Sequence, residues 1–137
     1  MTKDLMICQS CGQLVDRTRH KCPVQIKAKM ARDRKYAQNE KSTAKELTSN
    51  RWKKFRRMII LMDHGECQRC LIKLHKHTYD NLTIQHIQPR ALHPELMYDV
   101  DNCVTLCQTC NNYLGLRGLD FEWSPENRKN LFDDYVI

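Results

Sequence analysis

Residues 50–62 carry the clearest pattern of apolar positions in the chain and predict an amphipathic helix. The apolar side chains recur at spacings of three, four and three residues, which places them on one helical face. They are Trp52, Phe55, Ile59 and Met62. Each of the polar residues 48–50 can cap the first turn, and Gly65 is suited to end the helix. We expect the apolar face to pack into a core.

Residues 78–89 show the alternation that is typical of a strand. Leu82, Ile84 and His86 alternate with Thr83, Gln85 and Ile87. Pro89 has no N–H to donate and is expected to end the ladder. We therefore expect a strand that ends close to His86.

The pattern after this strand predicts a loop followed by two helices. We expect residues 90–105 to form a loop with short segments of its own. A helix is expected to begin around residues 105–109 and to be broken by the glycines at positions 115 and 118. Residues 124–126 combine an N-cap serine, a first-turn proline and an acidic residue, which predicts a short final helix.

Charge separates the front of the chain from its remainder. The 137 residues include 23 Lys or Arg and 16 Asp or Glu, a net charge of +7. Residues 1–60 carry a net charge of +11, whereas residues 61–137 carry −4. A basic arm joined to a differently used module suits a polyanion-binding protein, although a solvated linker is the plain alternative.

Hydropathy argues against a membrane protein. The mean hydropathy is −0.68, and no stretch approaches the roughly 20 apolar residues of a membrane span. The first residues also lack the apolar region of a secretory signal. We expect a cytoplasmic protein with no membrane contact.

Eight cysteines form the most informative part of the composition, because three C-x-x-C pairs occur among them. In a reducing compartment such pairs hold metal more often than they form disulfides. Two pairs, separated by 36 residues, predict a structural zinc site that pins a hairpin to the following helix. Its four ligands are Cys67, Cys70, Cys107 and Cys110. Cys103 fits neither pair and is predicted to be a buried thiol.

The remaining C-x-x-C pair predicts a small zinc knuckle near the N-terminus. Its predicted ligands are Cys8, Cys11, His20 and Cys22. Residues 25–49 show little apolar periodicity and predict a basic linker that is partly helical. The predicted organisation is a knuckle at 1–24, the linker at 25–49, a main domain at 50–123 and a helix or tail at 124–137.

Three polar residues form a distinctive constellation: a histidine at a strand end, an asparagine in the following loop and a polar residue directly after a paired cysteine. These residues are His86, Asn102 and Asn111. This constellation resembles the HNH endonuclease family, in particular its small bacteriophage members encoded near DNA-packaging genes. The resemblance covers about residues 50–123. It implies a ββα-metal finger, so the expected fold is a small zinc-stabilised α+β domain with flanking helices.

The resemblance also implies roles for these residues. His86 matches the general base that takes a proton from the attacking water, and Asn102 matches the asparagine that holds the loop. Asn111 and Gln85 match the positions that bind a catalytic Mg²⁺, Mn²⁺ or Ni²⁺. The implied substrate is double-stranded DNA. The implied setting is the host cytoplasm, with phage terminase and portal proteins as partners.

Departures from the family pattern leave a second function open. Gln85 and Asn111 are neutral amides, which bind cations more weakly than carboxylate or imidazole does. Neighbouring strand residues point to opposite faces, so Gln85 and His86 can share a site only where the chain bends before Pro89. The alternatives to an endonuclease are a DNA-binding or packaging-assembly module without turnover and, less expected, a zinc-bearing interaction protein.

Basic residues near the predicted helix supply candidate contacts to DNA phosphates. A solvated role is the alternative for each of them. The candidates are Lys53, Lys54, Arg56, Arg57 and Arg90. The zinc knuckle and basic linker would add phosphate affinity that does not depend on DNA sequence.

Overall fold

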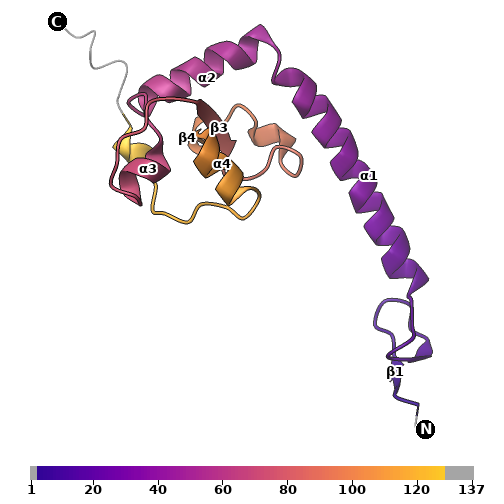
Figure 1. Cartoon of the computed structure of the whole chain (residues 1–137). Coiled ribbons are helices and arrows are strands. Elements are labelled where there is room, and N and C mark those ends of the chain that lie inside the picture. The colour runs from indigo at the N-terminus through magenta and orange to yellow at the C-terminus, as the bar shows by residue number, and fades with distance from the viewer. Residues whose placement is uncertain (1–2, 129–137) are drawn as a thin grey trace, which may run out of the picture. The chain divides into compact units, whose positions relative to one another are not determined.

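A computed structural model describes residues 3–128 of the chain (Figure 1). The chain divides into two compact units, one ending at Gln38 and the other beginning at Asn39. The helices and strands, in order, are β1 Leu5–Ile7, β2 Leu14–Asp16, α1 Pro23–Glu46, α2 Asn50–Met62, α3 Gln68–Ile72, β3 Leu82–His86, β4 Cys103–Cys107 and α4 Gln108–Leu114. Short 3-10 helices occupy Pro94–Leu96, Val100–Asn102 and Pro125–Asn127. The predicted α+β class is therefore confirmed.

The first unit combines a hairpin with most of a long helix. Strands β1 and β2 pair antiparallel, with Met6 opposite Val15. Helix α1 is continuous over 24 residues, whereas the sequence predicted a linker that is only partly helical. The segment is rich in Ala, Lys, Arg and Gln and has neither Gly nor Pro after its first residue, so helix propensity favours it throughout. Only Thr43 is buried along the helix, so the sequence contains no apolar stripe from which the helix could be predicted.

Helix α2 begins and ends at the predicted signals. Ser49 is its N-cap, and the Ser49 hydroxyl accepts a hydrogen bond from the Trp52 N–H at 3.1 Å. Past its end, Gly65 takes a positive φ of 70°, and its N–H donates to the Ile60 carbonyl at 2.8 Å. Trp52 and Ile59 are buried. The amphipathic helix and its apolar face are thus confirmed.

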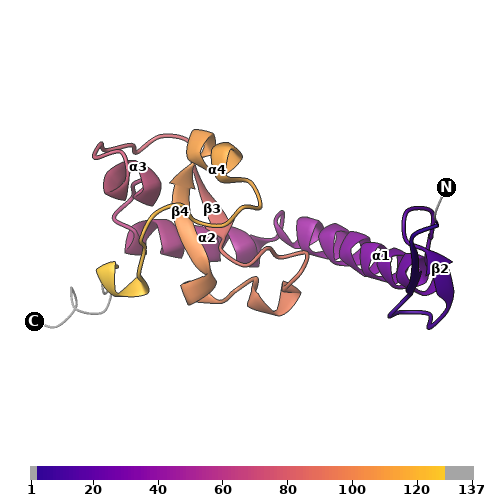
Figure 2. The ribbon, with the colours of Figure 1, turned by 90° about the horizontal axis from the view of Figure 1, so that it is seen from below.

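A two-stranded antiparallel sheet forms the centre of the second unit. Its register pairs Gln85 with Val104 and His86 with Cys103. Helix α2 contacts both strands, α4 contacts both strands, and α3 contacts β4. Figure 2 shows the two strands between α2 and α4. The sheet therefore separates two apolar clusters, one around Trp52 and Ile59 and the other around the cysteines of α3 and α4.

Strand β4 begins inside the segment that the sequence predicted as a loop. All five of its residues, Cys103–Cys107, are buried. A strand covered on both faces has no polar alternation, so periodicity could not distinguish it from an apolar run in a loop or helix. The following helix, α4, begins at Gln108, within the predicted range.

A buried ion pair ties the end of the described chain to the sheet. Arg128 Nε lies 2.8 Å from Asp63 Oδ1, and the two side chains are 3% and 1% exposed. The Arg128 guanidinium also donates to the carbonyls of Val100 and Cys103. Asp63 Oδ2 accepts from the Thr105 N–H of β4 at 2.8 Å. One carboxylate and one guanidinium therefore join α2, β4 and the C-terminal segment.

The predicted final helix is represented by one 3-10 turn, Pro125–Asn127, capped by Ser124. The remainder of that prediction, residues 129–137, lies outside the described residues. Among residues 3–128, no helix combines the length and apolar character that crossing a bilayer requires.

We expect the substitution Arg128→Met to lower the free energy of unfolding by about 3–5 kcal/mol, because it leaves the buried Asp63 carboxylate without a counter-charge. Urea denaturation of the purified protein measures the change. The double variant Asp63→Leu/Arg128→Met should lose less than the two single variants together, since neither charge remains buried. A single variant as stable as the wild type would contradict this account of the ion pair.

Candidate active site and metal centres

Four cysteine sulfurs converge between α3 and α4. Cys70 Sγ lies 3.8 Å from Cys107 Sγ and 3.6 Å from Cys110 Sγ. All four sulfurs, including that of Cys67, lie within 4.8 Å of one another, and all four residues are buried. Tetrahedral Zn²⁺ with Zn–S bonds of about 2.3 Å separates its sulfurs by about 3.8 Å. The geometry therefore fits the structural zinc that the sequence predicted.

Arg69 supports this cluster from outside. Its Nη1 donates to Cys110 Sγ at 3.5 Å, and its Nε lies 3.0 Å from Asp120 Oδ1. Arg69 and Lys73 hold the pKa of the Asp120 carboxyl well below its usual range, at about 2. A guanidinium beside several thiolates offsets part of their negative charge. No sequence pattern predicts this contact, because Asp120 is 51 residues away from Arg69.

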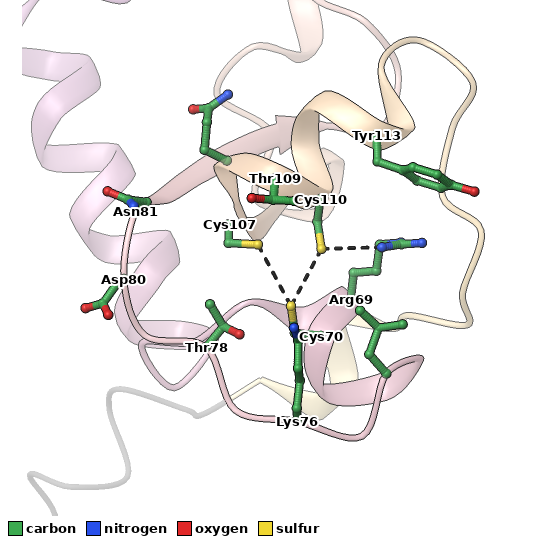
Figure 3. Close-up of a pocket in the computed structure, with 12 residues that line it drawn as sticks. Arg69, Cys70, Lys76, Thr78, Asp80, Asn81, Cys107, Thr109, Cys110 and Tyr113 are labelled. Carbon is green, nitrogen blue, oxygen red and sulfur yellow. Dashed lines mark hydrogen bonds between the residues drawn. The ribbon is translucent and has the colours of Figure 1, made fainter.

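A pocket of about 470 Å³ opens beside the four-cysteine cluster (Figure 3). Arg69, Lys76 and Tyr113 lie on its wall, together with three of the cysteines. Gln85, His86 and Asn111 do not line it. This pocket is therefore separate from the residues that the sequence assigned to catalysis.

The second cysteine cluster lies in the first unit. The ligand atoms of Cys8, Cys11, His20 and Cys22 lie within 4.8 Å of one another. Cys11 Sγ lies 3.6 Å from His20 Nε2. The residues that the sequence assigned to a zinc knuckle are thus brought together, and their set of three thiols and one imidazole fits zinc.

His86 occupies the last position of β3 and is buried against α2. Its ring stacks on Trp52, with centroids 5.3 Å apart and an interplanar angle of 27°. Its Nε2 lies 3.0 Å from the Met97 carbonyl oxygen. Because a carbonyl can only accept, Nε2 carries the proton and Nδ1 of the neutral ring is an acceptor. Burial, assisted by Arg90, lowers the pKa of His86 and favours that neutral ring.

The Nδ1 atom of His86 remains available for chemistry. It has no hydrogen-bond partner among residues 3–128, and it is not one of the fully buried polar atoms that lack a partner there. It therefore keeps contact with solvent, although the residue as a whole is only 9% exposed. Neither contact of His86 could be predicted from the sequence. A backbone carbonyl acceptor such as that of Met97 has no sequence signature, and Trp52 is far from His86 along the chain.

Asn102 pins the loop that connects β3 to β4. Its Oδ1 accepts from the Gln88 N–H at 2.8 Å, and its Nδ2 donates to the carbonyls of Gln88 and Leu96, each at 3.2 Å. The side chain is 6% exposed. Asn102 therefore fixes both ends of the chain segment that carries the Met97 carbonyl.

Gln85 and Asn111 lie on the other face of the sheet from His86. Strand β3 stays regular through His86, so these neighbouring side chains diverge instead of sharing one side of a bend. Gln85 Nε2 donates to the Gly115 carbonyl at 3.0 Å, just past the end of α4. Asn111, within α4, has an Oδ1 atom that is buried and without a hydrogen-bond partner among the described residues.

The unpartnered Oδ1 of Asn111 bears on whether a divalent ion fits here. Mg²⁺ and Mn²⁺ prefer oxygen ligands such as amide carbonyls, and a buried oxygen without a donor is costly unless something binds it. With its Nε2 engaged by Gly115, Gln85 keeps its own amide oxygen as a second donor atom. The residues present therefore fit a hard cation held by few protein ligands.

The basic candidates divide into free and engaged side chains. Lys53, Lys54 and Arg57 are exposed on α2. Arg56 instead donates to the Leu82 carbonyl of β3. Arg90 is engaged by α1, with Nη2 2.9 Å from Glu40 Oε1 and Nη1 2.7 Å from Thr43 Oγ1.

Comparison with known proteins identifies relatives of the second unit. The HNH endonuclease family model matches residues 67–116, a range that contains the four-cysteine cluster and all four candidate site residues. The crystal structure of the HNH endonuclease of the deep-sea thermophilic bacteriophage GVE2 with manganese ion is similar to this chain. Its TM-score is 0.52 at 27% identity, and the match covers 59% of this chain and 86% of that chain. No curated protein sequence matches the chain significantly.

We expect the purified protein to contain two equivalents of zinc by elemental analysis. Cys70→Ser should lose one equivalent and unfold the second unit, because the small core there depends on the metal. Cys22→Ser should lose the other equivalent and leave the second unit folded. Cys103→Ala is the matched control: its thiol belongs to neither cluster, so both equivalents should remain. Zinc loss from that control would contradict the assignment.

Proposed function

We propose that the HNH endonuclease domain matched at residues 67–116 hydrolyses double-stranded DNA with His86 as the general base and a divalent ion held by Gln85 and Asn111. The hydrogen bond from His86 Nε2 to the Met97 carbonyl is the observation that carries this proposal. It assigns the proton to Nε2 and leaves Nδ1 as a base with access to solvent.

Burial and stacking suit His86 to accept a proton. A general base must be neutral before it acts, and burial lowers the pKa of His86. The Trp52 ring and the Met97 carbonyl fix the direction in which Nδ1 points. Asn102 holds the loop around that carbonyl through three hydrogen bonds. The chain thus orients one imidazole nitrogen toward an attacking water.

Gln85 and His86 diverge on β3, so we propose that the scissile phosphate lies past His86, the last residue of the strand, where the sheet no longer lies between the two side chains. In an in-line displacement, the attacking and leaving oxygens lie on opposite sides of phosphorus, so the base and the cation act on different sides of it. When bound, the ion supplies charge stabilisation for the phosphate and its leaving oxygen. Zinc in the four-cysteine cluster has a structural role, because buried thiolates complete its coordination.

Several basic side chains are available to hold the DNA backbone. Lys53, Lys54 and Arg57 are exposed on α2, the helix whose other face packs on His86. We include the first unit in the DNA contact, since its helix segment from Lys27 to Lys35 is basic and exposed. Arg56 and Arg90 have intramolecular partners, so we assign them to positioning the fold.

A second candidate function is DNA binding without turnover. The observation that favours it is Gln85, whose amide donates to Gly115 where a carboxylate would bind a cation more strongly. In either case we propose a link to phage DNA packaging, with terminase and portal proteins as partners in the host cytoplasm. This link rests on analogy with the resembled family alone, and the similar crystal structure adds only that one such nuclease comes from a phage.

We expect His86→Ala to reduce cleavage of supercoiled plasmid by about 10²–10⁴-fold while affinity for a labelled duplex stays within twofold of wild type. The loss follows from removal of the general base, which contributes rate enhancement of this size. His75→Asn serves as the control, since His75 is exposed and its positive φ of 53° is one that Asn tolerates. Equal cutting by His86→Ala and wild type would rule out the proposed base. A wild type that binds DNA but cuts with none of Mg²⁺, Mn²⁺ or Ni²⁺ would favour the second candidate.

We expect Asn111→Leu to raise the Mn²⁺ concentration needed for half-maximal cleavage by about tenfold or more, because the amide oxygen is lost. Asn111→Asp should lower that concentration, since a carboxylate attracts the cation more strongly. The control is Asn112→Leu, which alters the neighbouring residue of α4, whose side chain is exposed and accepts from Gln108 Nε2 at 2.8 Å. A titration of plasmid cleavage against Mn²⁺ gives all three values. An unchanged requirement in Asn111→Leu would exclude Asn111 as a ligand.

A further inference from the structure

The orientation of His86 depends on where the Met97 carbonyl lies. Met97 itself is buried in the core cluster around Trp52, its carbonyl also accepts from Cys103 Sγ at 3.8 Å, and both of its neighbours in the chain are anchored. On one side, the Leu96 carbonyl accepts from Asn102 Nδ2 at 3.2 Å. On the other side stands Tyr98, whose hydroxyl donates to Glu46 Oε1 at 2.5 Å. The carbonyl that accepts the hydrogen bond from His86 is thus flanked by two anchored residues.

Tyr98 is anchored by more than its hydroxyl. Its ring packs edge-on against Trp52 and Phe55, with centroids 5.9 and 5.2 Å away. The Arg51 guanidinium lies over the Tyr98 ring, 3.8 Å from its centroid. Trp52 contacts Tyr98 and His86 at once, so the two rings share one packing partner.

Glu46 connects this anchor to the helices before the domain. It is the last residue of α1, and its Oε1 also accepts from the hydroxyl of Ser49, the N-cap of α2, at 3.2 Å. The carboxylate therefore joins the end of α1, the start of α2 and the β3–β4 loop. The family match begins at residue 67, so Glu46 lies outside the matched domain.

We propose that Tyr98, fixed by Glu46, is a positioning residue that keeps the Met97 carbonyl on Nε2 of His86 and so selects the tautomer whose Nδ1 is free. The catalytic consequence rests on the proposed function, whereas the effect on the tautomer does not. Without the Tyr98 hydroxyl, residue 98 keeps its aromatic contacts but loses its fixed link to Glu46. We expect the Met97 carbonyl then to shift, so that the N–H of His86 loses its preferred acceptor.

The rest of the loop has its own attachments, so this role can be tested without unfolding it. Asn39 Nδ2 donates to the Ala91 carbonyl at 3.0 Å, and Arg90 is held by Glu40 and Thr43. Tyr98→Phe removes one hydroxyl and preserves the aromatic contacts to Trp52 and Phe55. The variant is therefore expected to remain folded.

The experiment compares wild type, Tyr98→Phe, Glu46→Gln and the control Tyr79→Phe in zinc-loaded full-length protein. Tyr79 is exposed and stacks on His77, so its variant loses a hydroxyl that has no role at His86. Long-range ¹H–¹⁵N spectra report which nitrogen of His86 carries the proton, with the signal assigned from its loss in His86→Ala. Plasmid cleavage with Mn²⁺ gives kcat and KM for the same proteins.

We expect wild type and Tyr79→Phe to show a single Nε2–H tautomer and Tyr98→Phe to show a mixture. The kcat of Tyr98→Phe should fall about tenfold, a loss typical of modest misplacement, with KM for DNA unchanged. Glu46→Gln should lie between them, because an amide oxygen can still accept from Tyr98. An unchanged tautomer in Tyr98→Phe would overturn the proposal, whatever happens to kcat. A wild-type protein that does not cleave DNA would contradict the proposed function. The tautomer comparison would still test the role proposed for Tyr98.

Discussion

The structure of the second unit depends on holding together a sheet of only two five-residue strands. Such a hairpin is marginal in water and needs covering and fastening from outside. The cysteine cluster fastens the end of β4 at Cys107, and the Asp63–Arg128 pair fastens its other end and middle. These attachments also fix the register between β3 and β4. Because a slip of one residue would exchange the faces of every side chain, register decides where Gln85 and His86 point.

In the proposed function, His86 is a buried residue that serves a site at the surface. The ring is covered by Trp52 and bound through Nε2, so most of it belongs to the core. Burial has a chemical effect here, because it favours the neutral imidazole, while the hydrogen bond to Met97 decides which nitrogen is the base. A histidine on an open surface would be more accessible to substrate, but neither its tautomer nor the orientation of its ring would be fixed.

Features signalled by side chains near one another in sequence could be predicted, and features made by backbone or by distant residues could not. The two cysteine clusters followed from C-x-x-C spacing, and α2 followed from its apolar stripe and the Ser49 cap. Helix α1 has no buried face, and β4 is buried on both faces, so neither produces a periodic pattern. The acceptor for His86 is a carbonyl 11 residues away, and the Arg69–Asp120 contact spans 51 residues. Such contacts appear only once the chain is folded.

The ligand chemistry keeps the two kinds of metal apart within one small domain. Four buried sulfurs suit zinc and leave no position for substrate, whereas in the proposed function the amide oxygens of Gln85 and Asn111 hold a hard ion weakly. A weakly held ion needs further oxygen ligands, and the phosphate of bound DNA supplies them. Binding of the ion and binding of DNA then reinforce each other, since each completes a site that the protein alone leaves short of ligands. Under the proposed function, neutral amides at these positions therefore restrict tight metal binding to the complex with substrate, where hydrolysis is required.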